Sequence, residues 1–215
     1  MDKPTLYIGN KNYSSWSFRP WMALTGAGVD FEEVLIPFDF PGGNPDIKAL
    51  SPTGRVPFLR HGALKISESL AIIEYAAELY PQAGLLPGDR ADRALARSVS
   101  MEMLSSFQTL RSACPMNIRR AKAKIALPDG MEADINRIET IWRDLLQKSG
   151  GPFLFGGFGG ADAMFAPVVN RFDIYDLVSR NDTLAYMETM KAHPAWRKWE
   201  EAARAEPWIV EEDEV

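Results

Sequence analysis

The chain has 215 residues, of which 46% are apolar, and it carries a formal net charge of −5. This length suits one large domain or two small ones, and the apolar fraction is too high for a disordered chain. Because nucleic acids and anionic membranes both select clustered lysine and arginine, the net negative charge argues against either as a partner.

The first half of the chain alternates between strand and helix patterns. Residues 4–8 predict a short strand, and residues 18–27 predict a helix with Ser17 as its N-cap. Residues 31–36 predict a second strand. The Pro- and Gly-rich stretch that follows has room for one short helix near residues 46–50.

A β-hairpin is predicted next. Residues 57–60 and 63–66 form its strands, and His61-Gly62 joins them, because glycine supplies the positive φ that a tight two-residue loop requires. A helix then starts at Ser67. The order strand, helix, strand, helix, strand, strand, helix predicts a four-stranded mixed sheet with helices on its faces.

The second half of the chain has a different character. Residues 81–89 contain two prolines and two glycines and read as a linker. Helices are predicted at residues 91–125 with a kink at Pro115, and at residues 132–148, 162–178, 183–191 and 195–204. We therefore expect two domains, residues 1–81 and residues 90–215, of which the second is all-helical. The acidic residues 211–214 are expected to form a solvated tail.

Three segments carry recognisable chemistry. They are residues 13–19 (Tyr-Ser-Ser-Trp-Ser-Phe-Arg), residues 55–57 (Arg-Val-Pro) and residues 67–75, which begin Ser-Glu-Ser-Leu. Together they resemble the signature of the glutathione transferases, in particular the serine-type enzymes of the zeta class, which includes maleylacetoacetate isomerase. The resemblance runs through nearly the whole chain. It implies an α/β thioredoxin-like N-terminal domain that binds glutathione and an all-α C-terminal helical bundle.

Ser14 and Ser15 lie in the loop before the first helix, where the positive end of the helix dipole favours an anion. In the resembling enzymes, a serine hydroxyl here donates a hydrogen bond to the glutathione sulfur, and stabilising the thiolate makes the sulfur nucleophilic at neutral pH. The resemblance therefore implies Ser14 or Ser15 as the catalytic residue, and Ser14 matches the serine usually credited in zeta enzymes. The alternative is that both serines only cap the helix and turn the chain.

Two departures from the family pattern limit the activity that is expected. Trp16 stands where zeta enzymes carry a cysteine, which argues against the same isomerase activity. No Cys-x-x-Cys pair is present, which disfavours thiol–disulfide exchange of the thioredoxin kind. Arg19 is interpreted mainly as an ordinary surface or fold-pairing arginine, with a contribution to the electrostatics of the loop as the alternative.

The Val56-Pro57 bond resembles the cis-proline of thioredoxin-like folds. A cis bond before proline costs only about 0.5–1 kcal/mol. The backbone of Val56 would then pair with the cysteinyl backbone of glutathione, as an added strand does. The alternative is a trans proline that opens a strand.

Glu68 and Ser69 open the third predicted helix. The free amides there and the Ser69 hydroxyl can bind the γ-glutamyl carboxylate of glutathione, and the Glu68 carboxylate can pair with the γ-glutamyl ammonium. Arg55 can reach the glycine carboxylate, and Lys48 is a weaker candidate. The alternatives are ordinary helix capping by Ser67 and a solvated Arg55.

The helical domain contains a segment typical of helix capping, and it contributes candidate residues for binding the second substrate. Gly159 followed by Asp162 resembles the helix-capping segment of the family, and the glycine cluster there lacks the Gly-Lys-Ser/Thr ending of a phosphate loop. Trp16, Arg111 and Arg171 are the second-substrate candidates. Arg171 would bind an acidic substrate, as an arginine does in zeta enzymes.

We therefore expect a cytoplasmic, homodimeric glutathione transferase of detoxification type, which conjugates glutathione, its co-substrate, to a small electrophile. The alternatives are a glutathione-dependent isomerase or dehalogenase of zeta type, and a non-catalytic glutathione-transferase-like binding module. No metal is expected, because Cys114, His61 and His193 cannot assemble a zinc site of the usual type. The start of the chain lacks the apolar region of a signal peptide, and no apolar run approaches the roughly 18 residues that span a bilayer.

Overall fold

The computed structural model describes residues 2–38 and 44–215, so part of the predicted Pro- and Gly-rich stretch lies outside the described residues. The N-terminal part holds the sheet. Its described elements, in chain order, are β1 (Thr5–Ile8), α1 (Ser15–Gly26), β2 (Glu32–Leu35), α2 (Pro45–Leu50), β3 (Phe58–His61), β4 (Leu64–Ser67) and α3 (Ser69–Leu79).

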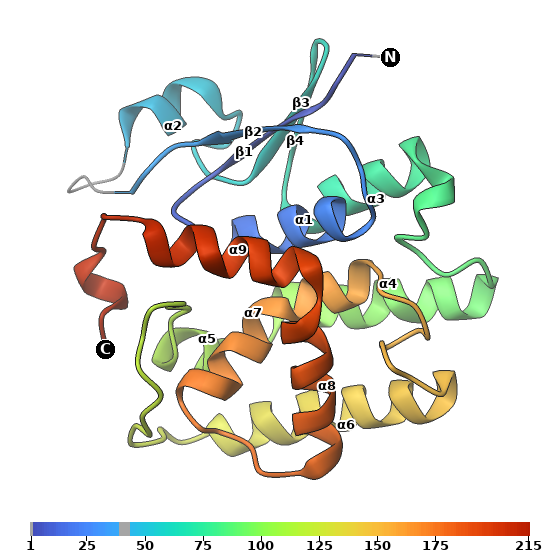
Figure 1. Cartoon of the computed structure of the whole chain (residues 1–215), viewed down its shortest axis with the longest axis vertical. Helices are drawn as coiled ribbons and strands as arrows, with labels where there is room; N and C mark the ends of the chain where they lie inside the picture. Colours follow the sequence, from blue (N-terminus) through green and yellow to red (C-terminus); the bar gives the residue numbers. More distant parts are fainter. Residues whose placement is uncertain (1, 39–43) are drawn as a thin grey trace.

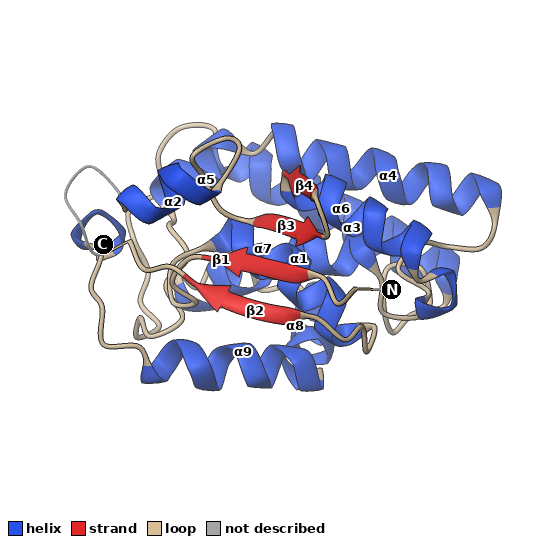
Figure 2. Ribbon diagram, turned by 90° about the horizontal axis from the view of Figure 1, so that it is seen from above, coloured by secondary structure: helices blue, strands red, loops and turns tan. Residues whose placement is uncertain are grey.

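The four strands form one mixed sheet in the order β2-β1-β3-β4, in which only β1 and β2 run parallel (Figure 2). Side chains alternate across it, as the period of a strand requires. Leu6 and Ile8 join the main core with α1 and α3, whereas Tyr7 stacks on Phe58 at 4.2 Å in a smaller cluster with α2. The predicted four-stranded mixed sheet with helices on its faces is confirmed.

The C-terminal part is helical throughout its described secondary structure, apart from isolated bridges near residue 155. Its elements are η1 (Pro81–Ala83), α4 (Arg90–Ser105), α5 (Gln108–Ala113), α6 (Met131–Ser149), α7 (Gly160–Ile174), α8 (Asn181–Ala192), α9 (Pro194–Ala205) and η2 (Glu211–Asp213). This confirms the predicted helical C-terminal domain. The exact boundary, placed by the sequence within residues 82–89, stays a prediction.

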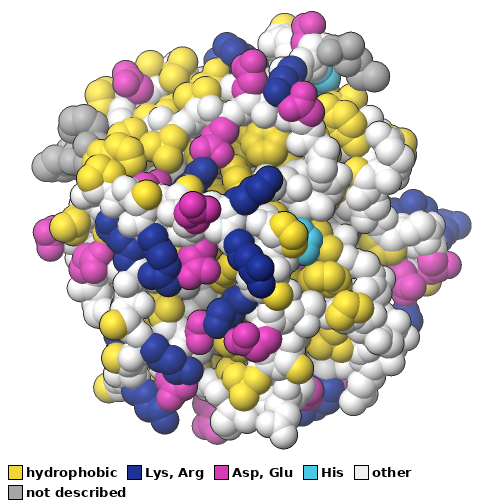
Figure 3. All heavy atoms as spheres, in the orientation of Figure 1, with side chains coloured by type: hydrophobic (Ala, Val, Ile, Leu, Met, Phe, Trp, Pro, Cys, Tyr) yellow, Lys and Arg dark blue, Asp and Glu magenta, His cyan; other side chains and the backbone are white. Residues whose placement is uncertain are grey.

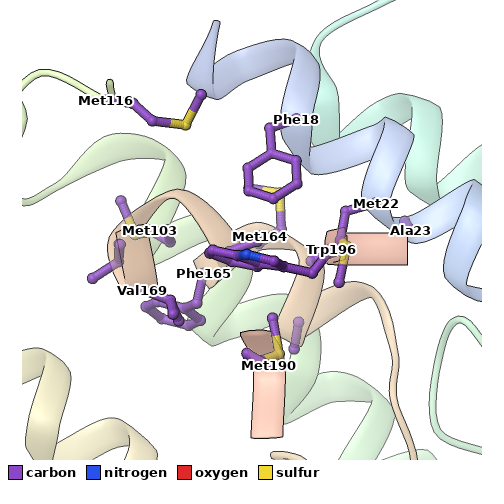
Figure 4. Packing of buried hydrophobic residues seen from close by; sticks show 14 of the residues in the cluster. Phe18, Met22, Ala23, Met103, Met116, Met164, Phe165, Val169, Met190 and Trp196 are labelled. Atoms are coloured by element: carbon purple, nitrogen blue, oxygen red, sulfur yellow. The ribbon is translucent and has the colours of Figure 1, made fainter. Parts of the chain in front are cut away.

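Helix α7 is the central element of the molecule, since it contacts α1, α3, α4 and α8 and is buried along nearly its whole length (Figure 1). Phe18 of α1 lies above the indole of Trp196 of α9 and next to Met164 of α7, with 5.2 Å between the Phe18 and Trp196 ring centres (Figure 4). The main core is therefore continuous between the sheet domain and the helices. The N-terminus of α1 is fixed by contacts with both.

Helix boundaries differ from the predictions at both serine segments. The first helix starts at Ser15, with Ser14 rather than Ser17 as its N-cap, so Pro20 lies inside the helix instead of in its first turn. The third helix starts at Ser69, whereas Ser67 is the last residue of β4. The hairpin turn is one residue later than predicted, because His61 pairs with Leu64 and the turn is residues 62–63.

The predicted helix over residues 91–125 was wrong beyond residue 113. The helix first breaks after Ser105, where Ser106 is extended and Phe107 has a positive φ of 61°, and α5 then ends at Ala113. A residue before proline is disfavoured in the α conformation, so Cys114-Pro115 stops the helix rather than kinking it. Residues 114–130 are irregular; residues 114–120 are buried or half-buried, whereas residues 121–130 are exposed except for the half-buried Ile125.

The acidic tail is largely solvated, as expected, since Glu211, Glu212 and Glu214 are exposed, but Asp213 is half-buried and the end of the chain is anchored. The Tyr13 hydroxyl donates to the Glu214 carboxylate at 2.5 Å, and Arg120 donates to the Val215 carbonyl at 2.8 Å. The last residues therefore lie against the loop that precedes α1 and against the segment after α5, next to which Figure 1 shows the C-terminus.

Surface charges of both signs are interspersed on the face that α9 crosses (Figure 3). Within residues 2–38 and 44–215, no helix is long and apolar enough to cross a bilayer. In the same ranges, no group of three or more His, Cys, Asp or Glu side chains is arranged to hold a metal ion.

Candidate active site

Two adjoining cavities lie where α1, α3 and α5 begin. The first, of about 280 Å³, is lined by Trp16, Thr53, Arg55, Val56, Pro57, Glu68, Ser69 and Arg111. The second, of about 390 Å³, shares Trp16, Val56 and Arg111 with the first. It also contains Tyr13, Ser14, Ser15, Arg171 and Asp213. Residues from all three sequence motifs thus meet at one place.

The two serines lie at the N-terminus of α1 and differ in what their hydroxyls do. A single turn leads into the helix, in which the Asn10 carbonyl accepts hydrogen bonds from the amides of Tyr13 and Ser14. The Ser14 hydroxyl accepts from the Ser17 amide at 3.3 Å and donates to the Ser17 hydroxyl at 2.7 Å. The Ser15 hydroxyl forms no hydrogen bond with the described part of the chain. Ser14 is therefore the helix cap, and Ser15 has an uncommitted donor facing the second cavity.

Pro20 connects the first motif to the third. Because proline has no amide hydrogen, the Trp16 carbonyl, four residues earlier, lacks its usual helical donor. The Ser69 hydroxyl supplies that donor at 2.8 Å. The start of α1 and the start of α3 are thereby fixed to one another. The Ser69 side chain is used for this contact, so its backbone amide is the group left to bind an anion.

Glu68 has a backbone conformation that is rare for a residue with a side chain, with φ 73° and ψ 130°. Such residues cluster at functional sites, where the surrounding structure enforces them. The first cavity is lined by Glu68, Arg55 and Val56, and the Val56-Pro57 bond is cis, as predicted. Lys48 lines neither of the two cavities but a neighbouring one beside Arg55.

Two arginines pack on Trp16, and a third, Arg171, is close enough to both for their charges to interact. The guanidinium carbons of Arg19 and Arg111 lie 4.3 and 4.6 Å from the centre of the Trp16 ring. Burial and the charges of Arg171 and Arg111 lower the pKa of Arg19, and burial and Arg111 lower the pKa of Arg171 to about 10. Arg19 was interpreted from sequence as an ordinary surface or fold-pairing arginine. The surface position is wrong, because Arg19 is fully buried, whereas the fold-pairing role agrees with the structure, in which the Arg19 Nε donates to the Met164 carbonyl at 3.0 Å.

The guanidinium groups of this cluster are incompletely paired. Among the described residues, both Nη atoms of Arg19 and the Nη1 of Arg171 are buried without a hydrogen-bond partner. Arg171 is only 4% exposed, yet it lines the second cavity, and its Nε donates to the Cys114 carbonyl at 2.7 Å. Buried guanidinium groups with unpaired donors are costly, so this cavity favours an anionic occupant in addition to the Asp213 carboxylate that lines it.

Sequence reasoning missed two ionisable residues of the second cavity, Tyr13 and Asp213. The Tyr13 hydroxyl is held by Arg119 and Glu214, and burial and the Glu214 contact raise its pKa, so Tyr13 does not offer a free hydroxyl to the cavity. Asp213 comes from the tail and contributes a carboxylate near Arg171. No local pattern predicts either contact, because the partners are far apart in the sequence.

A thioredoxin-like mixed sheet with an all-helical C-terminal domain, and with serines at the start of the first helix, defines the class of the glutathione transferases. Family models agree: the glutathione S-transferase N-terminal domain matches residues 13–79, and the C-terminal domain matches residues 119–202. The chain is 30% identical over 210 residues to a probable maleylacetoacetate isomerase of Caenorhabditis elegans, covering 89% of this chain and 94% of the relative. It belongs to the glutathione S-transferase family.

Two further relatives illustrate the range of the similarity. A zeta-class glutathione S-transferase of Euphorbia esula is 31% identical over 162 residues, which is 72% of this chain and 70% of the relative. A solved glutathione transferase homologue from Burkholderia, with bound glutathione, superposes with a TM-score of 0.71 at 27% identity. That match covers 95% of this chain and 99% of the homologue.

Proposed function

We propose that this protein conjugates glutathione to a small electrophile, with glutathione bound in the first cavity and its sulfur at the N-terminus of α1. The observation that carries the proposal is the Ser69–Trp16 hydrogen bond, which places the starts of α1 and α3 at one cavity. Two helix N-termini at one site favour a ligand with separate negative groups. The glutathione found in the Burkholderia homologue supports this choice of ligand.

Each part of glutathione then has a partner. The Glu68 carboxylate pairs with the γ-glutamyl ammonium, and the Ser69 amide binds the γ-glutamyl carboxylate. The Val56 backbone pairs with the cysteinyl backbone, in the manner of an added strand. Arg55 binds the glycine carboxylate. All four residues line the same cavity.

The serine pair activates the sulfur. The thiol proton passes to solvent, and a hydroxyl of Ser14 or Ser15 donates to the resulting thiolate, which the dipole of α1 also stabilises. The thiolate sulfur then forms a bond to an electrophilic carbon. In a substitution, the bond from that carbon to the leaving group breaks, and the leaving group departs with the electron pair toward the second cavity. In an addition to a double bond, the resulting carbanion stays part of the adduct and takes a proton from solvent. Ser15 has its donor uncommitted, whereas Ser14 has to turn its hydroxyl away from Ser17.

The electrophile occupies the second cavity beside Trp16, where Arg111 and Arg171 favour a carboxylate-bearing substrate. A second candidate activity, isomerisation of an acidic substrate, is favoured by the maleylacetoacetate isomerases among the relatives. Trp16 at the cysteine position of zeta enzymes argues against it. Product analysis after incubation with glutathione and an unsaturated dicarboxylic acid distinguishes an isomer from a thioether adduct.

We also propose that the protein is cytoplasmic and that it is a homodimer. Size-exclusion chromatography with light scattering tests the dimer, because it measures the molar mass in solution.

The glutathione site is tested by calorimetry. Wild-type protein should bind glutathione with micromolar to low-millimolar affinity, and Glu68→Gln should weaken binding about tenfold, since a charge-assisted hydrogen bond is worth about 1.5–3 kcal/mol. Glu74→Gln is the matched control on α3, because Glu74 pairs with Arg97 outside the cavity. Equal affinities in wild type and Glu68→Gln would contradict the assigned role of Glu68.

The preference for an acidic electrophile is tested with two aromatic substrates, chlorodinitrobenzene and its carboxylate-bearing analogue chlorodinitrobenzoate. Arg171→Met should lower the ratio of kcat/KM for the acid over that for the neutral compound about tenfold, equivalent to about 1.4 kcal/mol. Asp213→Asn removes the opposing charge from the same cavity and should raise the ratio. Shifts in the same direction for both variants would rule out an electrostatic origin.

A further inference from the structure

The loop that carries the serines is built with hydrogen bonds from the far end of the chain. Within the loop, the Asn10 carbonyl accepts from the amides of Tyr13 and Ser14, and the Tyr13 carbonyl accepts from the Ser15 amide. The backbone groups of Lys11 and Asn12 point outward from this turn. All four of them, two amides and two carbonyls, are bonded by residues of the C-terminal domain.

Glu206 supplies half of these contacts. One carboxylate oxygen accepts from the Lys11 amide at 2.7 Å, and the other accepts from the Asn12 amide at 3.0 Å. The Trp199 indole donates to the Lys11 carbonyl at 2.9 Å, and the Ile118 amide donates to the Asn12 carbonyl at 3.2 Å. The loop is therefore held on its outer side as completely as a strand within a sheet.

Glu206 is poorly suited to be an ordinary surface residue. It lies directly after the last residue of α9, is only 9% exposed, and makes no ion pair among those described in the structure. Burial raises the pKa of its carboxyl group, which the two amide hydrogen bonds partly oppose. A buried carboxylate costs free energy unless its oxygens are hydrogen-bonded, so its orientation toward the two amides is strongly determined.

The side chains of the loop are held from the same side. The Asn12 amide group donates to Asn117 at 2.9 Å and its oxygen accepts from the Arg119 amide at 2.9 Å. Arg119 in turn donates to the Tyr13 hydroxyl at 2.8 Å and to the carbonyls of Glu206 and Trp208. The segment after α5 and the residues after α9 thus form one support for the serine loop.

We propose that Glu206 is a positioning residue for thiol activation: by fixing the amides of Lys11 and Asn12, it holds Ser14 and Ser15 at the distance at which a hydroxyl reaches the glutathione sulfur. The inference rests on the proposed function. It means that the C-terminal domain contributes to activation of the thiol as well as to binding of the electrophile. Displacing a reacting group by about 1 Å costs on the order of a hundredfold in rate, so a modest relaxation of this loop is enough to be measured.

The test compares Glu206→Gln with wild type and with Glu201→Gln. Glutamine keeps the size and one acceptor oxygen but turns an NH₂ group toward an amide that needs an acceptor. Glu201 is exposed on α9 and gives the matched loss of one negative charge. The readouts are the pKa of the thiol in bound glutathione, from the ultraviolet absorbance of the thiolate, and kcat and KM for each substrate.

The direction of the thiol pKa shift separates positioning from simple electrostatics. Removing a negative charge near the sulfur would by itself lower the thiol pKa, whereas loss of the aligned hydroxyl raises it. We expect Glu206→Gln to raise the thiol pKa, to lower kcat about tenfold, and to leave KM for the electrophile unchanged. Glu201→Gln should behave like wild type. Glu206→Asp keeps the charge on a shorter side chain, so its thiol pKa and kcat should lie between those of wild type and Glu206→Gln.

A lowered melting temperature with an unchanged thiol pKa and kcat in Glu206→Gln would show a purely structural role and overturn the proposal. If Glu206→Gln gives too little folded protein, Glu206→Asp is measured in the same way, and the same unchanged values overturn the proposal. Failure of the proposed function is distinguishable, because it would appear as unchanged activation in the serine variants themselves. In that case Glu206 would have no activating group to position.

Discussion

Replacement of Asp162 by alanine should lower the free energy of unfolding by about 3–5 kcal/mol, because it leaves three buried donors unpaired at about 1–3 kcal/mol each. The Asp162 side chain is 1% exposed. One oxygen accepts from the Leu154 amide at 3.0 Å and the Tyr186 hydroxyl at 2.9 Å, and the other accepts from the Gly159 amide at 3.0 Å. These contacts fix the start of α7, the central helix. Urea unfolding followed by circular dichroism measures the loss.

Two companion variants separate these contributions. Tyr186→Phe removes one donor and leaves the carboxylate its two amides, so it should cost no more than about 1.5 kcal/mol. Asp162→Asn keeps one acceptor oxygen, so its loss in the free energy of unfolding should lie between the losses in Tyr186→Phe and Asp162→Ala. If Asp162→Ala destabilises no more than Tyr186→Phe, the capping segment does not organise α7 in the way described.

Removal of both serine hydroxyls should reduce kcat/KM for glutathione conjugation at least a hundredfold, equivalent to about 2.7 kcal/mol. At least one of the single variants, Ser14→Ala or Ser15→Ala, should lose tenfold or more. The variants Ser14→Ala and Ser15→Ala are distinguished by their free energies of unfolding. Ser14 is the N-cap of α1, so Ser14→Ala should also cost about 1 kcal/mol of folding free energy, whereas Ser15→Ala should leave stability nearly unchanged.

Steady-state kinetics with a neutral aromatic electrophile and thermal unfolding of the same preparations provide both measurements. Ser14→Thr and Ser15→Thr keep a hydroxyl and serve as controls. Full turnover in the double alanine variant would exclude the serine mechanism. It would direct attention to the helix dipole and to Arg111, which lines both cavities.

Elements with a strong local pattern were predictable from the sequence. The strands near residues 5–8 and 32–35 and helices α6, α8 and α9 lie within a few residues of their predicted positions, because apolar periodicity determines which face is buried. The hairpin also lies close to its prediction. Its turn is displaced by one residue because Gly62, with φ 59°, opens the turn rather than closing it.

Features that depend on distant residues were not predictable. The sequence predicts Pro20 in the first turn, but α1 starts earlier, and the Trp16 carbonyl receives its hydrogen bond from Ser69, 53 residues further along the chain. Residues 114–125 have an apolar pattern compatible with a helix, but Pro115 ends α5. The acidic composition of the tail predicts its exposure, but its contacts with Tyr13 and Arg120 are long-range and leave no local signal.

The residues of the site also divide into those with a local sequence pattern and those that depend on distant parts of the chain. Arg55, Val56, Glu68 and Ser69 belong to short motifs, so a family pattern identifies them together, and the structure brings them into one cavity. Glu206 contacts Lys11 across 195 positions, and nothing in the local sequence around Glu206 distinguishes it from the neighbouring acidic residues. A single sequence therefore indicates the groups that touch glutathione far better than those that hold the loop in place.

The state of the sulfur in the complex with glutathione is the most direct test. Titration of thiolate absorbance should give a thiol pKa below the value of about 8.5 typical of an unperturbed cysteine, and the double variant Ser14→Ala/Ser15→Ala should return it toward that value. An unperturbed thiol pKa in the wild-type complex, or a lowered one that persists without either hydroxyl, would contradict the account.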